Sequence, residues 1–192
     1  KRAYRDYYIL KMDIRKYFNS IDKKILYKIL TRRIKDEKLL WLIRQILTAQ
    51  KRQKGIEIGN YTSQTFANIY LNELDQYIKR VLRVENYVRY MDDFVLLLPS
   101  KEDCIKYKST ISTFLKDALH LELNAKSRYF PNKMGVNFCG YRIFTTHSLL
   151  RLSSKKKIKR NVKKWNKQYL KKDLDMKNTI QSINSWLGHA SH

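Results

Sequence analysis

The pattern of apolar and polar positions predicts a chain in which short strands alternate with amphipathic helices. Residues 7–14 form an apolar run rich in β-formers, with Asp13 near its end, and such a run is typical of a buried strand. Two helices should follow, because Asp22 and Asp36 can each cap a helix that carries apolar residues at helical spacing. The expected core-facing residues are Ile25, Leu26, Ile29, Leu30 and Ile34 in the first helix, and Leu39, Leu40, Ile43, Ile46 and Leu47 in the second.

The middle of the chain predicts a loop, a long helix and a hairpin. Residues 51–60 are polar and contain two glycines, which indicates a loop or small hairpin. A long helix should begin at Thr62 or Ser63, continue to Val81 and lie across a sheet. Residues 87–98 contain two β-rich runs interrupted by Met91-Asp92-Asp93, the pattern of a hairpin with acids at its tip.

The remaining pattern predicts one more helix on the sheet and then a separate basic module. Ser100 and Asp103 form a capping box for a helix, and residues 121–123 and 136–144 are strand-like. Between residues 151 and 177 there are 12 Lys and Arg against two Asp, so we expect a domain of residues 1–152 and a helical domain of residues 153–192. The small core expected for the second domain consists of Trp165, Tyr169, Ile180, Ile183, Trp186 and Leu187.

The composition and net charge of the chain indicate the class of partner that it binds. The 192 residues are 43% hydrophobic, which can supply a core, and 41 Lys and Arg against 17 Asp and Glu leave a net charge of +24. Such an excess favours a polyanionic partner, with nucleic acid ahead of an acidic membrane surface. No apolar run exceeds five residues and no signal core follows the N-terminus, so we expect a cytoplasmic protein with no membrane partner. Cys104 and Cys139 stand alone, which argues against a zinc site or a disulfide framework.

Three aspartates are the strongest candidates for chemistry. Asp13 ends a predicted strand, and Asp92 and Asp93 lie at a predicted hairpin tip; adjacent strands are only about 4.8 Å apart. Pairing of these strands would bring three carboxylates together, and carboxylates are the ligands that Mg²⁺ prefers in phosphoryl transfer with two metal ions. Each acid alone could equally be a turn or strand-end residue. The conjunction favours a metal site, because a buried acid is costly unless it is paired or bound.

The residues around these acids resemble the motifs of reverse transcriptases. The segment Lys11-Met12-Asp13-Ile14-Arg15-Lys16-Tyr17-Phe18 resembles the first palm motif of that family, and Tyr90-Met91-Asp92-Asp93 resembles its signature turn. The match runs from about residue 7 onward in the order of the family. The resemblance implies an α+β fold, with an antiparallel palm sheet backed by helices and followed by a small α-helical thumb. The implied activity is RNA-directed DNA synthesis with two Mg²⁺ ions, for which Mn²⁺ could substitute, on an RNA template, a DNA primer and deoxynucleoside triphosphates.

The same resemblance implies roles for individual residues. Asp13, Asp92 and Asp93 would hold the metal ions, and the Ile14 carbonyl would complete a coordination shell. Phe18 would press against the sugar and exclude a ribose hydroxyl, although a core phenylalanine is about as compatible with the sequence alone. The residues of the signature turn that would contact substrate are Tyr90 and Met91.

The segment Ile58-Gly59-Asn60-Tyr61-Thr62-Ser63-Gln64 narrows the resemblance. Most reverse transcriptases have a glutamine before this glycine and a proline after this serine, whereas Ile58 and Gln64 stand here. This form resembles the enzymes of diversity-generating retroelements, which are bacterial, archaeal or phage-encoded. It implies errors opposite template adenines and a basic accessory protein. The substrate-binding residues expected in this segment are Ile58, Gly59, Ser63 and Gln64.

Three further features complete the expected site. Lys126, in a segment that resembles the next palm motif, would act as general acid toward pyrophosphate, or it is one solvated lysine among many. Residues 138–141 resemble the primer-grip hairpin, with Phe138, Gly140 and Tyr141 as contacts, or form a plain β-turn. A basic stretch should contact the phosphate backbone through Lys155, Lys156, Lys157, Lys159, Arg160, Lys163 and Lys164.

Two alternatives remain open at this point. One is a group II intron or retron type of reverse transcriptase, against which the segment of residues 58–64 argues. The other is a non-catalytic RNA-binding protein with a polymerase-like fold, although such a protein would gain little from acids that repel phosphate. The chain begins almost at the first palm motif, so the fingers are largely missing from this sequence. We therefore expect these 192 residues alone to bind RNA but to polymerise poorly.

Overall fold

The computed structural model describes residues 6–49 and 52–190, and it separates into two compact units, Lys1–Asn132 and Lys133–His192. The predicted domain boundary near residue 152 lies later in the chain than this division. The difference arises because residues 136–150 form a small sheet of their own, which groups with the helices that follow it.

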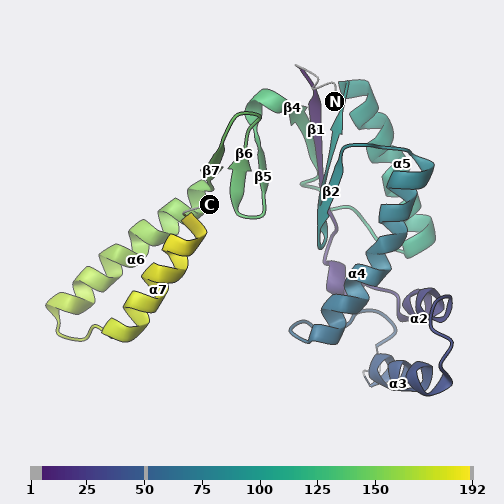
Figure 1. Ribbon diagram of the computed structural model, residues 1–192, viewed down its shortest axis with the longest axis horizontal. Helices are drawn as coiled ribbons and strands as arrows, with labels where there is room; N and C mark the ends of the chain where they lie inside the picture. Colours follow the sequence, from purple (N-terminus) through teal and green to yellow (C-terminus); the bar gives the residue numbers. More distant parts are fainter. Residues whose placement is uncertain (1–5, 50–51, 191–192) are drawn as a thin grey trace. The chain divides into compact units, whose positions relative to one another are not determined.

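The first unit is built on a four-stranded antiparallel sheet (Figure 1). The strand order is β2-β3-β1-β4, so that β1 lies in the interior of the sheet and its Leu10 and Met12 are completely buried. This arrangement confirms the predicted strand, hairpin and antiparallel palm sheet, whereas the last strand was not predicted. The strands are β1 (Tyr8–Asp13), β2 (Tyr87–Tyr90), β3 (Asp93–Leu98) and β4 (Arg128–Pro131).

Three helices of the first unit begin where the sequence predicted caps, whereas the long helix begins at Tyr61, just before the predicted start, and has no side-chain cap in the described part of the chain. The Asp22 carboxylate accepts hydrogen bonds from the Lys24 and Ile25 amides, the Asp36 carboxylate accepts one from Leu39, and the Ser100 hydroxyl accepts one from Asp103. The helices are α1 (Tyr17–Ser20), α2 (Lys23–Thr31), α3 (Glu37–Thr48), α4 (Tyr61–Gln76), continued by a π-helical turn η1 (Tyr77–Val81), and α5 (Lys101–Leu119).

Helices α4 and α5 support the sheet. Helix α5 packs on β1, β3 and β4, and the Tyr70 hydroxyl of α4 donates a buried hydrogen bond of 2.7 Å to the Leu119 carbonyl at the end of α5. The core between these elements includes Phe94, Leu96 and Leu74, all fully buried. Tight packing of this kind holds the backbone of the strands in place, and with it the side chains at their ends.

Several predicted core positions are exposed instead. On α3 only Ile43 and Leu47 are buried, while Leu39 and Ile46 are exposed, because the helix packs on α2 along a narrower stripe than its sequence pattern suggested. Val81, at the end of the predicted long helix, is also exposed, whereas Ile34 lies beyond the end of α2 but still packs against the core. Residues 121–123 form only an isolated bridge, between Ile14 and Leu123, rather than a strand.

The second unit combines a small antiparallel sheet with two helices, after a 3₁₀ turn, η2 (Asn132–Met134), at the division between the units. The Trp186 indole of α7 donates a 3.3 Å hydrogen bond to the Ser154 hydroxyl of α6. Of the expected core, Tyr169, Ile180, Ile183 and Leu187 are exposed, so that prediction is wrong for these residues. The elements are β5 (Val136–Phe138), β6 (Tyr141–Ile143), β7 (Ser148–Leu150), α6 (Leu152–Leu170) and α7 (Met176–Ala190).

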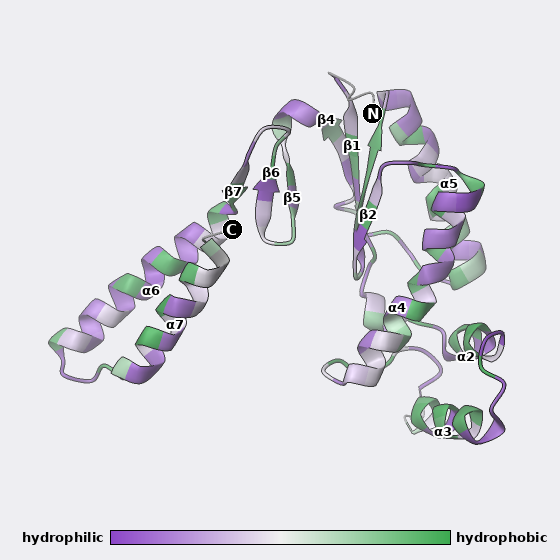
Figure 2. Ribbon diagram, viewed as in Figure 1, coloured by the Kyte–Doolittle hydropathy of each residue, from purple (hydrophilic) through white to green (hydrophobic). Residues whose placement is uncertain are grey.

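Helix α6 is mostly hydrophilic. Figure 2 shows hydrophilic colours along most of α6, as expected from its run of lysines. Across residues 6–49 and 52–190, none of the helices combines the length and the apolar character that crossing a membrane requires.

Candidate active site

The structure brings Asp13, Asp92 and Asp93 to one end of the four-stranded sheet. Asp13, the last residue of β1, is the register partner of Asp93, the first residue of β3. Asp93 also pairs with Tyr90, so that Met91 and Asp92 form the two-residue loop of the β2–β3 hairpin. The Ile14 amide donates a 3.3 Å hydrogen bond to the Asp92 carbonyl, which ties the hairpin tip to the end of β1. The predicted pairing of these strands is therefore observed.

The environment of Asp13 shows the electrostatic consequence of this convergence. Burial raises the pKa of the Asp13 carboxyl above its usual value, and the neighbouring Asp92 and Asp93 raise it further. A hydrogen bond from Asn124 and the charge of Lys11 act in the opposite direction. Three carboxylates therefore repel one another here, and a bound cation would relieve that repulsion.

Lys11 is a residue of this site that the sequence reasoning missed. Its Nζ lies 2.5 Å from Asp93 Oδ2, and both side chains are partly buried. Alternation along β1 places Lys11 and Asp13 on the same face, but only the observed strand register makes Asp93 the diagonal neighbour of Lys11 across the β1–β3 pair. The lysine supplies positive charge beside the acids.

Asp93 also has an atom that suits a metal ligand. Its Oδ1 is buried and has no hydrogen-bond partner in the part of the chain that the structure describes. A buried carboxylate oxygen without a partner is costly, and coordination of a cation would satisfy it. The described residues hold no group of three His, Cys, Asp or Glu already placed to bind a metal ion, and Lys11 engages the Asp93 carboxylate. The donor chemistry nevertheless fits a hard divalent cation.

A tight turn at residues 124–127 holds Asp13 from the other side. The backbone amide of Asn124 donates a 2.7 Å hydrogen bond to the Asp13 carbonyl, and its side-chain Nδ2 donates one of 3.0 Å to Asp13 Oδ2. The Ser127 hydroxyl accepts a 3.2 Å hydrogen bond from the Asp13 amide. Lys126, the predicted general acid, is exposed on this turn, and its amide donates to Asn124 Oδ1. Sequence reasoning therefore selected the lysine of this motif and missed the two residues that contact the aspartate.

Residues on both sides of the predicted substrate segment contact α1, the short helix that carries Phe18. The Ile56 amide donates a 2.9 Å hydrogen bond to the Phe18 carbonyl, and the Tyr17 hydroxyl donates a buried one of 2.5 Å to the Ala67 carbonyl of α4. The Phe18 ring is half-buried and meets the Tyr17 ring edge-on. These contacts fix α1 and the start of α4 to each other, close in sequence to Asp13.

Within this segment the side chains differ in exposure. Ile58 and Gln64 are exposed, whereas Ser63 is buried. Gly59 has a φ of +105°, which side-chain-bearing residues rarely adopt, and the space where a Cβ would stand is open. The segment therefore presents an open glycine backbone just before the N-terminus of α4, and its contact with substrate stays a prediction.

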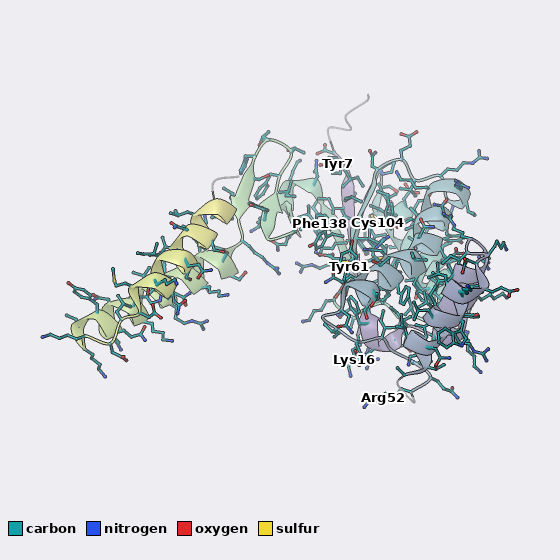
Figure 3. All side chains as sticks on the ribbon, turned by 60° about the horizontal axis from the view of Figure 1, so that its bottom comes forward. Tyr7, Lys16, Arg52, Tyr61, Cys104 and Phe138 are labelled. Atoms are coloured by element: carbon teal, nitrogen blue, oxygen red, sulfur yellow. The ribbon has the colours of Figure 1, made fainter. Side chains whose placement is uncertain are left out.

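The remaining predicted site residues belong to the second unit. Cys139 and Gly140 both have positive φ, so Phe138 and Tyr141 are joined by the two-residue hairpin loop that requires such angles. All seven predicted phosphate contacts on α6 are exposed, and Figure 3 shows the long side chains of this helical pair extending away from the ribbon. Their contact with primer or template remains a prediction.

An antiparallel sheet that gathers acids at one end, with helices packed beside it, is the arrangement of a polymerase palm. Residues 1–143 match the family described as Reverse transcriptase (RNA-dependent DNA polymerase). The chain therefore belongs to the reverse transcriptase family.

Similar proteins include intron-encoded and bacterial sequences. The chain is 24% identical to the putative COX1/OXI3 intron 2 protein of Saccharomyces cerevisiae, in a match that covers 72% of this chain and 24% of the yeast protein. It is 25% identical to protein YkfC of Escherichia coli, with 75% of this chain and 49% of that protein covered. The chain thus spans about a quarter of the length of the yeast protein and about half of that of YkfC.

Solved structures agree on the fold. Apo telomerase from Candida tropicalis matches with a TM-score of 0.62 at 15% identity, over 75% of this chain and 32% of that chain. The complex of that telomerase with a fragment of telomeric RNA matches with a TM-score of 0.61 at 14% identity, over 76% of this chain and 30% of that one. At such identities the likeness concerns the fold.

Proposed function

We propose that this chain is the catalytic palm, with part of the thumb, of an RNA-directed DNA polymerase that adds deoxynucleotides to a primer on an RNA template. The observation that carries this proposal is the convergence of Asp13, Asp92 and Asp93 at the end of the sheet. Membership of the reverse transcriptase family supports it. A protein that only bound RNA would be weakened by three acids facing phosphate.

Divalent cations belong to this proposal, and members of the family generally use them. Asp13, Asp92 and Asp93 would hold two Mg²⁺ ions, with the Ile14 carbonyl as a further ligand. When bound, such ions would polarise phosphate oxygens and favour deprotonation of the primer hydroxyl. The unpartnered Asp93 Oδ1 and the raised pKa of Asp13 support the fit. Lys11 and Asn124 orient Asp93 and Asp13, so that the protein fixes its ligands in advance.

The other residues have roles in binding. Phe18 would lie against the sugar of the incoming nucleotide, and the open backbone at Gly59 would let that nucleotide approach closely. Ile58, Ser63, Gln64, Tyr90 and Met91 would complete the nucleotide site, and Lys126, which is exposed on its turn, would donate a proton toward pyrophosphate. In the second unit, the hairpin residues and the seven cations of α6 would hold primer and template.

The finer proposal is that the enzyme is the error-prone polymerase of a diversity-generating retroelement, assisted by an accessory protein. The form of residues 58–64 supports this subtype. A second candidate is an intron-encoded reverse transcriptase. The names of two relatives favour it: the yeast intron 2 protein and a 91 kDa protein in the cob intron of Schizosaccharomyces pombe.

Primer extension tests the activity. The full-length protein should extend a DNA primer on an RNA template with Mg²⁺, and Asp92→Ala and Asp93→Ala should abolish extension while RNA binding is retained. Binding without extension by the unaltered full-length protein would contradict the proposal and favour the non-catalytic RNA-binding alternative.

Sequencing the extension products tests the subtype. We expect an excess of errors at template adenines, and Ile58→Gln should reduce that excess, because Ile58 departs from the glutamine of most reverse transcriptases. Thr62→Ala, a change at an exposed position of the same segment, serves as control. Equal error rates at all four template bases would favour the intron-encoded candidate.

A further inference from the structure

Arg89 of β2 makes a two-pronged ion pair with Asp75 of α4. Arg89 Nε lies 2.7 Å from Asp75 Oδ1, and Nη2 lies 2.5 Å from Oδ2. The arginine side chain is only 11% exposed and that of the aspartate 25%. This geometry holds the guanidinium and the carboxylate in one relative orientation, because two nitrogens of the planar guanidinium donate to the two carboxylate oxygens at the same time.

The third nitrogen of the same guanidinium, Nη1, contacts the turn that carries Asp92. Arg89 Nη1 donates a 2.9 Å hydrogen bond to the Met91 carbonyl and a 3.3 Å one to Asn68 Oδ1 on α4. Met91 lies directly before Asp92 and has a φ of 54°. A left-handed conformation costs an ordinary residue about 1–2 kcal/mol, so it persists where neighbouring groups hold it.

Tyr87 orients the partner of this arginine. Its hydroxyl donates a 2.6 Å hydrogen bond to Asp75 Oδ1, the oxygen that also accepts from Arg89 Nε. Tyr87 and Arg89 are two residues apart on β2 and therefore face the same way, toward α4. Burial and the neighbouring Asp75 raise the pKa of Tyr87, so the hydroxyl remains a donor.

We infer that Arg89, oriented by Asp75 and Tyr87, is a positioning residue that holds the Met91 carbonyl and thereby places the Asp92 carboxylate beside Asp13. The inference rests on the proposed function, in which those two acids act together. The proposed role is more than linking β2 to α4. The Nε and Nη2 atoms of Arg89 contact Asp75 of α4, whereas Nη1 contacts the carbonyl of Met91 in the turn itself. Loss of the hydrogen bond from Arg89 Nη1 to the Met91 carbonyl should lower kcat for primer extension and leave primer–template binding unchanged.

The test compares Arg89→Lys with the full-length wild-type protein. Lysine keeps the charge and can pair with Asp75, but it lacks the fork that reaches the Met91 carbonyl at the same time. We expect kcat for extension to fall about 10- to 100-fold, as for a displacement of about 1 Å at a reacting group, with KM for primer–template within about twofold. Hydrogen exchange of a peptide covering residues 87–94 should also become faster in Arg89→Lys.

Two further variants separate positioning from stability. Arg32→Lys is the matched control, because Arg32 Nη1 pairs with Glu73 on the same helix α4 at 3.0 Å and no contact to the turn accompanies that pair in the described residues. It should leave kcat and the exchange of residues 87–94 unchanged. Tyr87→Phe removes one hydrogen bond to Asp75 and keeps Arg89, so we expect a change of about two- to fivefold in kcat, in the same direction as Arg89→Lys.

The outcomes separate this inference from the proposed function. If Arg89→Lys matched Arg32→Lys in both kcat and exchange, the inference would be overturned while polymerase activity stood. If the wild-type protein extended no primer, the proposed function would fail, and the exchange of residues 87–94 would still decide whether Arg89 holds the turn. Should Arg89→Lys not fold, Tyr87→Phe decides by the same two measurements, and wild-type values in both overturn the inference.

Discussion

The two units of this chain bury their apolar residues very differently. The first unit has a continuous core under its sheet, with residues such as Leu10, Phe94 and Tyr70 completely enclosed. Among the described residues of the second unit, only Val136 is a buried hydrophobic residue, and no residue of α6 is buried. The first unit can therefore place side chains within narrow limits, whereas the second mainly displays charge.

This difference matches what each unit is proposed to do. Metal-dependent chemistry needs carboxylates in defined positions, and packed strands with supporting hydrogen bonds supply them. Contact with a phosphate backbone needs positive charge along a surface and tolerates variation in geometry. The comparison predicts that substitutions in the first unit act on chemistry and stability, and that those in the second act mainly on salt-dependent binding.

The largest expected effect comes from a single carboxylate. Asp13→Asn should lower primer extension by about a thousandfold or more, since metal ions contribute several kcal/mol to phosphoryl transfer and Asp13 lies at the centre of the acid cluster. Single-turnover extension measures the effect. Asp173→Asn, which removes an exposed acid from the second unit, should leave extension unchanged. Comparable losses in the two variants would contradict the proposed division of roles.

Stability should show the next largest contrast. Leu10→Ala opens a cavity in the fully buried interior of the sheet and should cost about 2–5 kcal/mol of unfolding free energy. Ile180→Ala, at a position that is about half exposed on α7, should cost less than about 1 kcal/mol. Urea unfolding, monitored by hydrogen exchange in each unit, measures both changes in the free energy of unfolding. A larger cost at Ile180 would show that α7 is covered in the full-length protein.

Salt dependence should distinguish the cations of the two units. Replacing Lys155, Lys156 and Lys157 together with glutamine should reduce the slope of log affinity for single-stranded RNA against log salt by about 2, because each lost phosphate contact removes about 0.7. The matched control replaces three exposed lysines of α5, Lys101, Lys106 and Lys116, with the same change in net charge. An equal decrease in both proteins would mean that total charge, rather than the position of α6, determines binding.

The smallest effects concern two glycines of the second unit, and they should have opposite signs. Gly140→Ala should destabilise the hairpin by about 1 kcal/mol, because Gly140 has a φ of +89°. Gly188→Ala should stabilise α7 by about 0.5–1 kcal/mol, since a Cβ there meets open space and alanine favours helix. Thermal unfolding of the two variants measures both shifts. Unchanged or increased stability in Gly140→Ala would show that the hairpin tolerates a side chain at this angle.

Local signals in the sequence predicted much of this molecule. The caps at Asp22, Asp36 and Ser100 were recognisable because each hydrogen bond spans two or three residues. The hairpin at Met91-Asp92 was recognisable because two β-rich runs surround a short polar break. Strand β4 was missed, since it is short, contains Pro131 and pairs with β1 across more than a hundred residues of sequence.

The candidate site divides in the same way. The sequence by itself determined the positions of Asp13, Asp92 and Asp93 at the ends of strands, because alternation and turn chemistry are local. Only the tertiary structure decided that Lys11 pairs with Asp93, that Asn124 and Ser127 hold Asp13, and that Arg89 links Asp75 to the turn. It also decided which face of α3 is buried and that the units divide after Asn132. Each of these contacts joins residues that come together only when strands and helices pack, and no periodicity along the chain encodes such a pairing.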